Sequence, residues 1–195
     1  MRVVLATRND HKVDEVSRIL RAEGVDVELV ALPADAPDVA ETESTFAGNA
    51  LLKARSAAEV TGLPAIADDS GLRVDALHGM PGVLSARWSG RHGDDAANLA
   101  LLLAQMSEVP DGRRDAQFVC AAGWVVPGVS EHVVEGVLEG SLAHEARGTN
   151  GFGYDPIFVP AGYALTTAEL RPHEKDSISH RGQALRLLAR SFLAQ

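Results

Sequence analysis

Hydrophobic and polar positions repeat along this chain with two different periods. An apolar run at 3–6 gives way to a polar turn, and apolar residues at helical spacing then predict a helix from about Asp10. Alternating apolar residues over 25–29 predict a strand after that helix. A strand, a helix and a second strand in this order favour an α/β fold.

The same two periods predict the elements that follow. A second helix is expected to begin after Ser44 or Thr45 and to end at Gly62. The other predicted elements are a short buried strand at 64–67, a helix at 94–106, strands at 116–126 and 133–138 joined by a turn at 127–128, a strand at 157–159, and a last helix at about 179–193. This mixture predicts a mixed, mainly α/β sheet.

Composition limits the class of protein. A chain of 195 residues can form one sizeable core or two small lobes. The formal net charge of −9 argues against nucleic acid as a partner, because duplex binding needs a basic face. The single Cys120 excludes an internal disulfide, and its apolar neighbours predict a buried structural thiol. With no apolar run near ~20 residues and an early polar break after the first strand, we expect a soluble, cytoplasmic protein with no membrane partner.

The turn between the first strand and the first helix is a candidate anion site. Unpaired backbone N–H groups and the helix dipole point at such a turn. Lys12 is unfavourable to the helix at this end, and it makes better sense facing a polyphosphate. The alternative is a solvated lysine with an ordinary cap. The turn comprises Thr7, Arg8, Asn9, Asp10, His11 and Lys12.

Carboxylates form a second candidate site. Glu41 lies in an acidic loop, and Asp68 and Asp69 follow the predicted strand at 64–67, where α/β proteins usually bind ligands. Carboxylates suit Mg²⁺, and one of them can also orient or deprotonate a water. The alternative is that 68–71 is merely a turn, which these residue types favour.

Two polar residues of the second predicted helix lie on the same face. Asn49 and Lys53 are four residues apart, so both side chains leave the helix in nearly the same direction. They point either into the cleft that holds the carboxylates or into solvent.

Further candidates lie near the end of the chain. Phe152 stands between two glycines, which allow a planar base to approach and stack; the alternative is that it fills the core. Lys175, His180 and Arg181 gather around the start of the last helix, where they could equally be solvated. The seven histidines show no zinc spacing, so no metal other than Mg²⁺ or Mn²⁺ is expected.

The order of these motifs resembles the inosine/xanthosine triphosphate pyrophosphatase family. These enzymes hydrolyse non-canonical purine nucleoside triphosphates (ITP, dITP and XTP) to the monophosphate and pyrophosphate. The resemblance spans essentially the whole chain and rests on Thr-x-Asn-x-x-Lys at 7–12, Asp-Asp-Ser-Gly-Leu at 68–72, Pro-Gly-Val-x-Ser-Ala-Arg at 81–87, Gly-Phe-Gly-Tyr-Asp-Pro-Ile-Phe at 151–158 and Ser-His-Arg-Gly-x-Ala at 179–184. One departure is Arg8, where the family usually has glycine; it either changes the turn or gives the phosphates an extra cation.

The resemblance implies a catalytic centre that uses Mg²⁺, with Mn²⁺ as a substitute. Glu41 and Asp69 would hold the metal, and Asp69 would also accept the proton of the attacking water. Lys53 would stabilise charge near the scissile group. Glu43 lies two residues from Glu41 in the same loop, so the choice of metal ligand between them stays open.

The resemblance also implies where the substrate binds and how the protein is built. The expected fold is an elongated mixed central sheet flanked by helices, one domain (1–195) of two lobes with the active-site cleft between them, in a homodimer. Ser70 would touch substrate. The triphosphate would lie on Thr7, Asn9 and Lys12, the base and sugar on Phe152, Gly153, Tyr154 and Asp155, and the purine edge on Lys175, His180 and Arg181.

Two other functions are compatible with parts of this pattern. Related Maf-like proteins act on pyrimidine triphosphates, but the histidine–arginine pair at 180–181 favours a purine. A nucleotide-binding module without turnover would not need Lys12, Lys53 and Asp69 together with Glu41. The sequence does not rank ITP, dITP and XTP, and it does not show how GTP is rejected.

Overall fold

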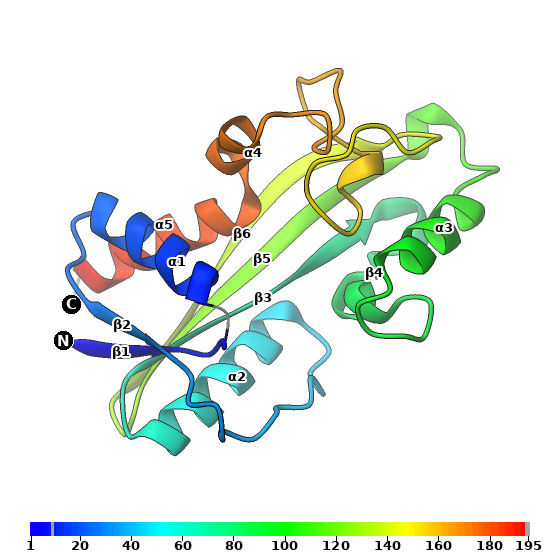
Figure 1. Ribbon diagram of the computed structural model, residues 1–195. Coiled ribbons are helices and arrows are strands. Elements are labelled where there is room, and N and C mark those ends of the chain that lie inside the picture. Colours follow the sequence, from blue (N-terminus) through cyan, green and yellow to red (C-terminus); the bar gives the residue numbers. More distant parts are fainter. Residues whose placement is uncertain (9, 194–195) are drawn as a thin grey trace. The chain divides into compact units, whose positions relative to one another are not determined.

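The computed structural model describes residues 1–8 and 10–193, in which helices and strands alternate only as far as β3 (Figure 1). Short 3₁₀ turns also occur at Asp75–Leu77, Gly82–Arg87, Asp111–Arg113 and Asp155–Ile157. The helices and strands are β1 (Arg2–Leu5), α1 (Asp10–Ala22), β2 (Glu28–Ala31), α2 (Phe46–Thr61), β3 (Ala65–Val74), β4 (Met80–Pro81), α3 (Asp95–Gln105), β5 (Asp115–Val126), β6 (Ser130–Leu142), β7 (Phe158–Pro160), α4 (Pro172–Ile178) and α5 (His180–Leu193).

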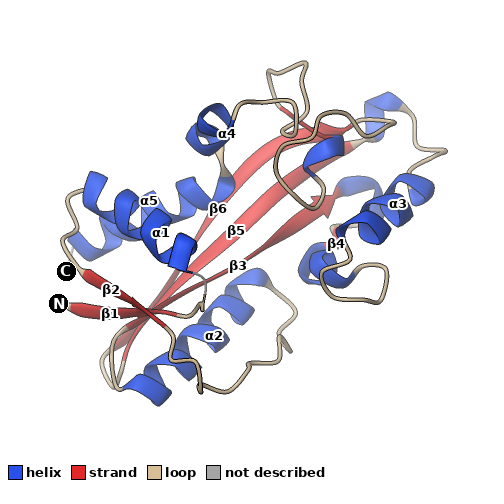
Figure 2. Ribbon diagram, viewed as in Figure 1, coloured by secondary structure: helices blue, strands red, loops and turns tan. Residues whose placement is uncertain are grey.

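The strands form one mixed sheet with helices beside it (Figure 2). The strand order is β2-β1-β3-β5-β6-β7, and β4 pairs with β3. β1 runs parallel to β2 and β3, whereas β4 is antiparallel to β3 and β7 is antiparallel to β6. The predicted mixed sheet flanked by helices is therefore confirmed.

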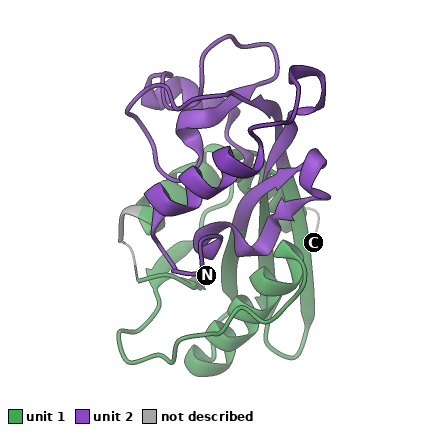
Figure 3. Cartoon of the chain, turned by 90° about the vertical axis from the view of Figure 1, so that its right-hand side faces the viewer, with its two compact units in different colours: residues 1–69, 120–136, 181–195 green, residues 70–119, 137–180 purple. Residues whose placement is uncertain are grey.

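The chain divides into two compact units, coloured green and purple in Figure 3. Unit 1 comprises 1–69, 120–136 and 181–195, and unit 2 comprises 70–119 and 137–180. The chain passes from one unit to the other within β3, β5 and β6 and after the first residue of α5 (His180). Each unit has its own hydrophobic core.

In unit 1, successive residues of each strand face different helices. Val3 and Leu5 of β1 lie in a core cluster with residues of α1 and α5, and Val4 lies in a second cluster with α2. β3 follows the same rule, because Ile66 belongs to the first cluster and Ala67 to the second. This two-residue alternation is what a strand covered on both faces requires.

The core of unit 2 is more aromatic. Phe118 of β5 packs on Phe158 of β7 with ring centroids 4.4 Å apart, and Leu102 of α3 is completely buried in the same cluster. The cluster also contains Tyr154, whose side chain anchors the loop before β7 to this core. That loop is the one that sequence assigns to base binding.

Local signals predicted several boundaries correctly. Thr45 caps α2, where its hydroxyl accepts a hydrogen bond from Gly48 N at 3.0 Å, and Gly62 ends the helix in the left-handed region with φ of 68°. The predicted helix at 94–106 is α3, capped by Asp94. Cys120 is completely buried, and burial raises the pKa of its thiol, as expected of a structural residue.

Some predicted bounds were wrong and one helix was missed; the strand expected at 133–138 spans Ser130–Leu142. The strand expected at 64–67 continues to Val74, and the strand expected at 25–29 begins only at Glu28. The region before the last helix contains α4, a seven-residue helix without apolar periodicity that was not predicted. In the part of the chain that the structure describes, no helix is long and apolar enough to cross a membrane.

Candidate functional site

The extension of β3 changes how its two aspartates are used. Asp68 and Asp69 lie inside the strand, so their side chains leave it on opposite faces. β1 pairs with β3 only as far as Leu5 opposite Ile66, and β3 therefore runs on beyond the end of its parallel neighbour. Both carboxylates lie just past that point, next to the turn that follows β1.

Asp68 faces α1 and α5 and binds a cation from each. Lys12 Nζ lies 2.5 Å from its Oδ1, and Arg181 Nε lies 3.3 Å from its Oδ2. Burial by itself would raise the pKa of Asp68, but the charges of Lys12 and Arg181 hold that pKa far below its usual range. Asp68 is consequently a permanent anion that orients two cations.

Asp69 faces α2 and contacts both polar residues that share a face of that helix. Lys53 Nζ lies 2.8 Å from Asp69 Oδ1, and Asn49 donates to Asp69 Oδ2 at 3.1 Å. Burial and the nearby carboxylate of Glu41 raise the pKa of Asp69, against the opposing effect of Lys53. Of the two directions predicted for Asn49 and Lys53, the one toward the carboxylates is correct.

Lys53 also joins Asp69 to the acidic loop. Its Nζ lies 3.1 Å from Glu41 Oε1. Burial would lower the pKa of Lys53, but Asp69 and Glu41 together raise it, so the amine stays charged. Glu43 takes a different position: its backbone N–H donates to Asn49 Oδ1 at 3.0 Å, and its Cβ and Cγ lie beside Gly48. Glu41 is thus the acidic-loop residue that the structure brings to Asp69.

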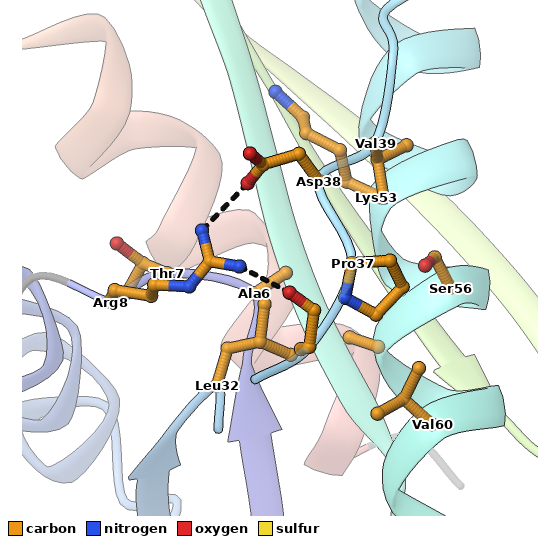
Figure 4. Close-up of a pocket in the computed structure, with 12 residues that line it drawn as sticks. Ala6, Thr7, Arg8, Leu32, Pro37, Asp38, Val39, Lys53, Ser56 and Val60 are labelled. Atoms are coloured by element: carbon orange, nitrogen blue, oxygen red, sulfur yellow. Dashed lines mark hydrogen bonds and ion pairs between the residues drawn. The ribbon is translucent and has the colours of Figure 1, made fainter. Parts of the chain in front are cut away.

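The turn after β1 is tied to the same loop. Thr7 O accepts a hydrogen bond from Leu32 N at 2.9 Å, and Arg8 Nη1 lies 2.7 Å from Asp38 Oδ1 (Figure 4). Arg8 Nη2 also donates to the carbonyl of Ala36. Of the other residues predicted in this turn, Asn9 and the side chains of Asp10 and His11 lie outside the described part of the chain.

Unit 2 contains a cavity of about 130 Å³ that brings the other predicted residues together. Its walls come from β3, from the 3₁₀ turn at Gly82–Arg87, from α3 and β5, and from the glycine-rich loop with α4. The cavity is lined by Ser70, Gly71, Ser85, Ala86, Asp95, Asn98, Phe118, Phe152, Gly153, Tyr154, Asp155, Lys175 and His180.

The glycine-rich loop leaves Phe152 at this cavity with 68% of its surface exposed. Phe152 N donates to Asp155 Oδ2 at 2.8 Å, and Lys175 Nζ lies 2.5 Å from the same oxygen. The Lys175 ammonium also lies 5.2 Å from the centroid of the Phe152 ring. Asp155 holds the backbone of Phe152, and the ring lies outside the core. The exposed ring can therefore stack on a planar ligand.

The other residues of this pocket are held more tightly. Tyr154 is buried and its hydroxyl donates to Ser85 O at 2.9 Å, while Gly153 N donates to Asp95 Oδ2 at 2.9 Å. The His180 ring stacks on Phe118, with centroids 5.1 Å apart and planes 14° apart. These contacts fix the wall of the pocket before any ligand enters.

One known protein family matches nearly the whole chain. The model of the Ham1 family matches residues 3–191. The chain belongs to the Ham1 family.

Relatives of this Ham1 chain match it over nearly its full length. A protein of Frankia alni named dITP/XTP pyrophosphatase is 61% identical over 194 residues, which is 97% of this chain and 96% of that protein. One of Mycobacteroides abscessus with the same name is 59% identical over 192 residues, or 96% of this chain and 93% of that protein.

Solved Ham1 structures share the fold. The HAM1 protein of Coxiella burnetii has a TM-score of 0.92 at 41% identity and covers 100% of both chains. The Ham1 protein of Staphylococcus aureus has a TM-score of 0.91 at 37% identity, covering 100% of this chain and 99% of that one.

Some residues of this Ham1 chain have a larger part in the site than sequence indicated. Asp68 was noticed only as one of two acidic residues, yet it contacts both Lys12 and Arg181. Phe118 and Asp95, which support His180 and Gly153, carried no signal at all. Their partners are at least 58 residues away in the sequence, so local spacing could not have found them.

Proposed function

We propose that this chain hydrolyses non-canonical purine nucleoside triphosphates, namely ITP, dITP and XTP, to the monophosphate and pyrophosphate. The observation that carries the proposal is Lys53, whose single ammonium bridges Glu41 and Asp69 in unit 1. A buried cation between two carboxylates suits an enzyme that moves negative charge, and a module that only binds nucleotide does not need it. The names of the relatives support the same activity.

The donor set fits Mg²⁺, with Mn²⁺ as a substitute. Glu41 and Asp69 offer hard carboxylate oxygens, and a positive charge already lies between them. Among the described residues, no group of three His, Cys, Asp or Glu side chains could hold a metal, so phosphates and water would complete the shell. When bound, Mg²⁺ supplies charge that stabilises the phosphates and makes water more acidic.

The residues of unit 1 have separate parts in the reaction. A water attacks the α-phosphorus, its proton passes to Asp69 Oδ1 or Oδ2, and the bond to the bridging oxygen breaks with its electron pair leaving on pyrophosphate. Lys53 stabilises the charge that develops on the leaving group. Thr7, Asn9 and Lys12 hold the triphosphate, and Asp68 keeps Lys12 extended.

The residues of unit 2 read the base. Phe152 stacks on the purine, and Ser70, Gly153, Tyr154 and Asp155 form the walls around base and sugar. The N–H donors of Lys175 and His180, together with those of Arg181 from unit 1, would pair with the 6-keto oxygen of hypoxanthine or xanthine. Adenine presents an amino donor there, and two donors that face each other in a desolvated site leave both unpaired. We also propose one domain of two lobes, a homodimer and a cytoplasmic location.

A panel of triphosphates tests the function. The purified protein would be given ITP, dITP, XTP, GTP, ATP and dTTP with Mg²⁺, and phosphate and pyrophosphate would be detected separately. We expect pyrophosphate and a monophosphate from ITP, dITP and XTP, with kcat/KM at least about 10²-fold above that for ATP, since hydrogen-bonding sites reject mismatched analogues strongly. Release of single phosphates, or equal rates with dTTP, would refute the proposal.

A further inference from the structure

The loop between β2 and α2 carries Glu41 and is tied down at both of its ends. At its start, Leu32 N donates to Thr7 O at 2.9 Å. At its end, Glu43 N donates to Asn49 Oδ1 at 3.0 Å. The ten residues between these bonds include one turn, in which Ala36 N donates to Pro33 O at 3.1 Å, so the ends alone leave the position of Glu41 weakly determined.

Arg8 lies in the turn after β1 and bonds to the middle of this loop. Its guanidinium uses two nitrogens at once, with Nη1 at 2.7 Å from Asp38 Oδ1 and Nη2 donating to the carbonyl of Ala36 (Figure 4). The fork of an arginine suits such paired acceptors, and a lysine could reach only one of them. Two simultaneous bonds fix the direction of the loop as well as its distance.

Most of the loop is exposed, and within 33–43 only Ala36 is buried. A cavity of about 130 Å³ lies between it and α2, lined by Pro37 and Val39 on the loop side and by Ser56 and Val60 on the helix side. Arg8 and Asp38 both line this cavity, and Figure 4 draws the ion pair between them. Where side chains do not fill the space under a segment, its hydrogen bonds must keep it in place.

We propose that Arg8 is a positioning residue for the metal ligand Glu41: it holds the loop at Ala36 and Asp38 so that Glu41 stays beside Lys53 and Asp69. The proposal rests on the function proposed above, because that function makes Glu41 a ligand. The phosphate-binding turn and the metal-binding loop become mechanically linked through one side chain.

The ion pair between Arg8 and Asp38 is exposed, so its effect on the loop can be measured apart from its effect on the free energy of unfolding. The Arg8 and Asp38 side chains are 43% and 92% exposed, and exposed ion pairs add little to the free energy of unfolding. Removing Arg8 should therefore leave Tm unchanged while it loosens the loop. If Arg8 served only folding, its removal would lower Tm and would not specifically loosen the loop.

Hydrogen–deuterium exchange and Mg²⁺ dependence test the proposal together. The proteins are the unmodified chain, R8A, D38A, the double variant R8A/D38A and R8K, with D35A as a matched control because Asp35 is an exposed carboxylate of the same loop. Exchange at 33–43 is followed without metal or nucleotide. Hydrolysis of ITP is then measured over a Mg²⁺ series, and KM for ITP is measured at saturating Mg²⁺.

We expect R8A and D38A each to speed exchange at 33–43 and to raise the half-saturating Mg²⁺ concentration on the order of 10-fold, as loss of a residue that supports a metal ligand commonly does. The double variant should be no worse than R8A, R8K should be intermediate, and D35A should match the unmodified chain. KM for ITP should change less than about 2-fold, because metal and nucleotide contacts would be restored at saturation.

A direct phosphate contact predicts a different pattern. If R8A raises KM for ITP with no change in Mg²⁺ dependence or in exchange, or if D38A behaves like the unmodified chain, the positioning role is overturned. If the unmodified chain does not hydrolyse ITP, the proposed function fails by itself. The exchange measurement needs no substrate and still decides whether Arg8 holds the loop.

Discussion

The charged cluster of unit 1 and the cavity of unit 2 are built from different kinds of contact. In unit 1, ion pairs join side chains of β3, α1, α2 and α5, so each charge depends on a partner from another element. In unit 2, carboxylates hold backbone N–H groups of the glycine-rich loop, and the aromatic surface of Phe152 is left exposed. The first arrangement suits phosphate chemistry that is common to all substrates, and the second suits a choice among bases.

The largest effect is expected when the acid–base group of unit 1 is removed. Asp69→Asn keeps the shape of the side chain and removes its charge, and the single amide oxygen can accept from only one of Lys53 and Asn49. We expect kcat to fall by about 10²–10⁴-fold for every substrate, since a positioned proton acceptor is worth this much. The variant should still fold, as judged by circular dichroism. A near-normal kcat at saturating Mg²⁺ would remove Asp69 from the mechanism.

A smaller effect, on the Mg²⁺ requirement, is expected for Glu41 and not for Glu43. Glu41→Gln is expected to raise the Mg²⁺ requirement by about 10–100-fold, because it takes away one of two carboxylate ligands. Glu43→Gln is the matched control, since its side chain lies beside Gly48 and away from Lys53. The readout is the half-saturating Mg²⁺ concentration for ITP hydrolysis. Equal shifts in both variants would contradict the choice of Glu41.

The smallest effect is expected for Arg181, the one unit 1 residue that we assign to base recognition. Arg181 belongs to unit 1 and is held by Asp68, yet we assign its donors to the purine edge. Arg181→Ala should reduce the ratio of kcat/KM for ITP to that for ATP by about 10-fold, the value of one lost hydrogen bond to a desolvated keto group. An equal loss for ITP and ATP would assign Arg181 to the phosphates.

Local chemistry explains which parts of the fold the sequence could predict. The ends of α2 depend on Thr45 and Gly62, whose preferences act within one turn of the helix, and both were correct. The path of β3 depends on its neighbours. Asp68 and Asp69 are residues typical of turns. The strand nevertheless continues through them, because β3 also pairs with β5, its neighbour on the side opposite β1.

The site shows the same division between local and distant determinants. Asn49 and Lys53 were placed on one face because helical spacing fixes that relation. The choice between Glu41 and Glu43 could not be made, because it depends on the contact of Glu41 with Lys53, twelve residues away on α2. The contact of Lys175 with Asp155 likewise needs α4, and only its starting proline signalled that helix.

The claim that unit 1 acts on all triphosphates while unit 2 selects the base has one direct test. Lys53→Met removes the bridging charge but keeps the stem, and His180→Phe keeps a ring on Phe118 but removes its N–H donors. Values of kcat/KM for ITP, XTP and ATP would be measured for both variants and the unmodified chain.

We predict that Lys53→Met lowers all three values by the same factor, so the ratio of ITP to ATP does not change. His180→Phe should lower the values for ITP and XTP and leave that for ATP nearly unchanged, which reduces the ratio by about 10-fold. A changed ratio in Lys53→Met, or an unchanged ratio in His180→Phe, would contradict the account.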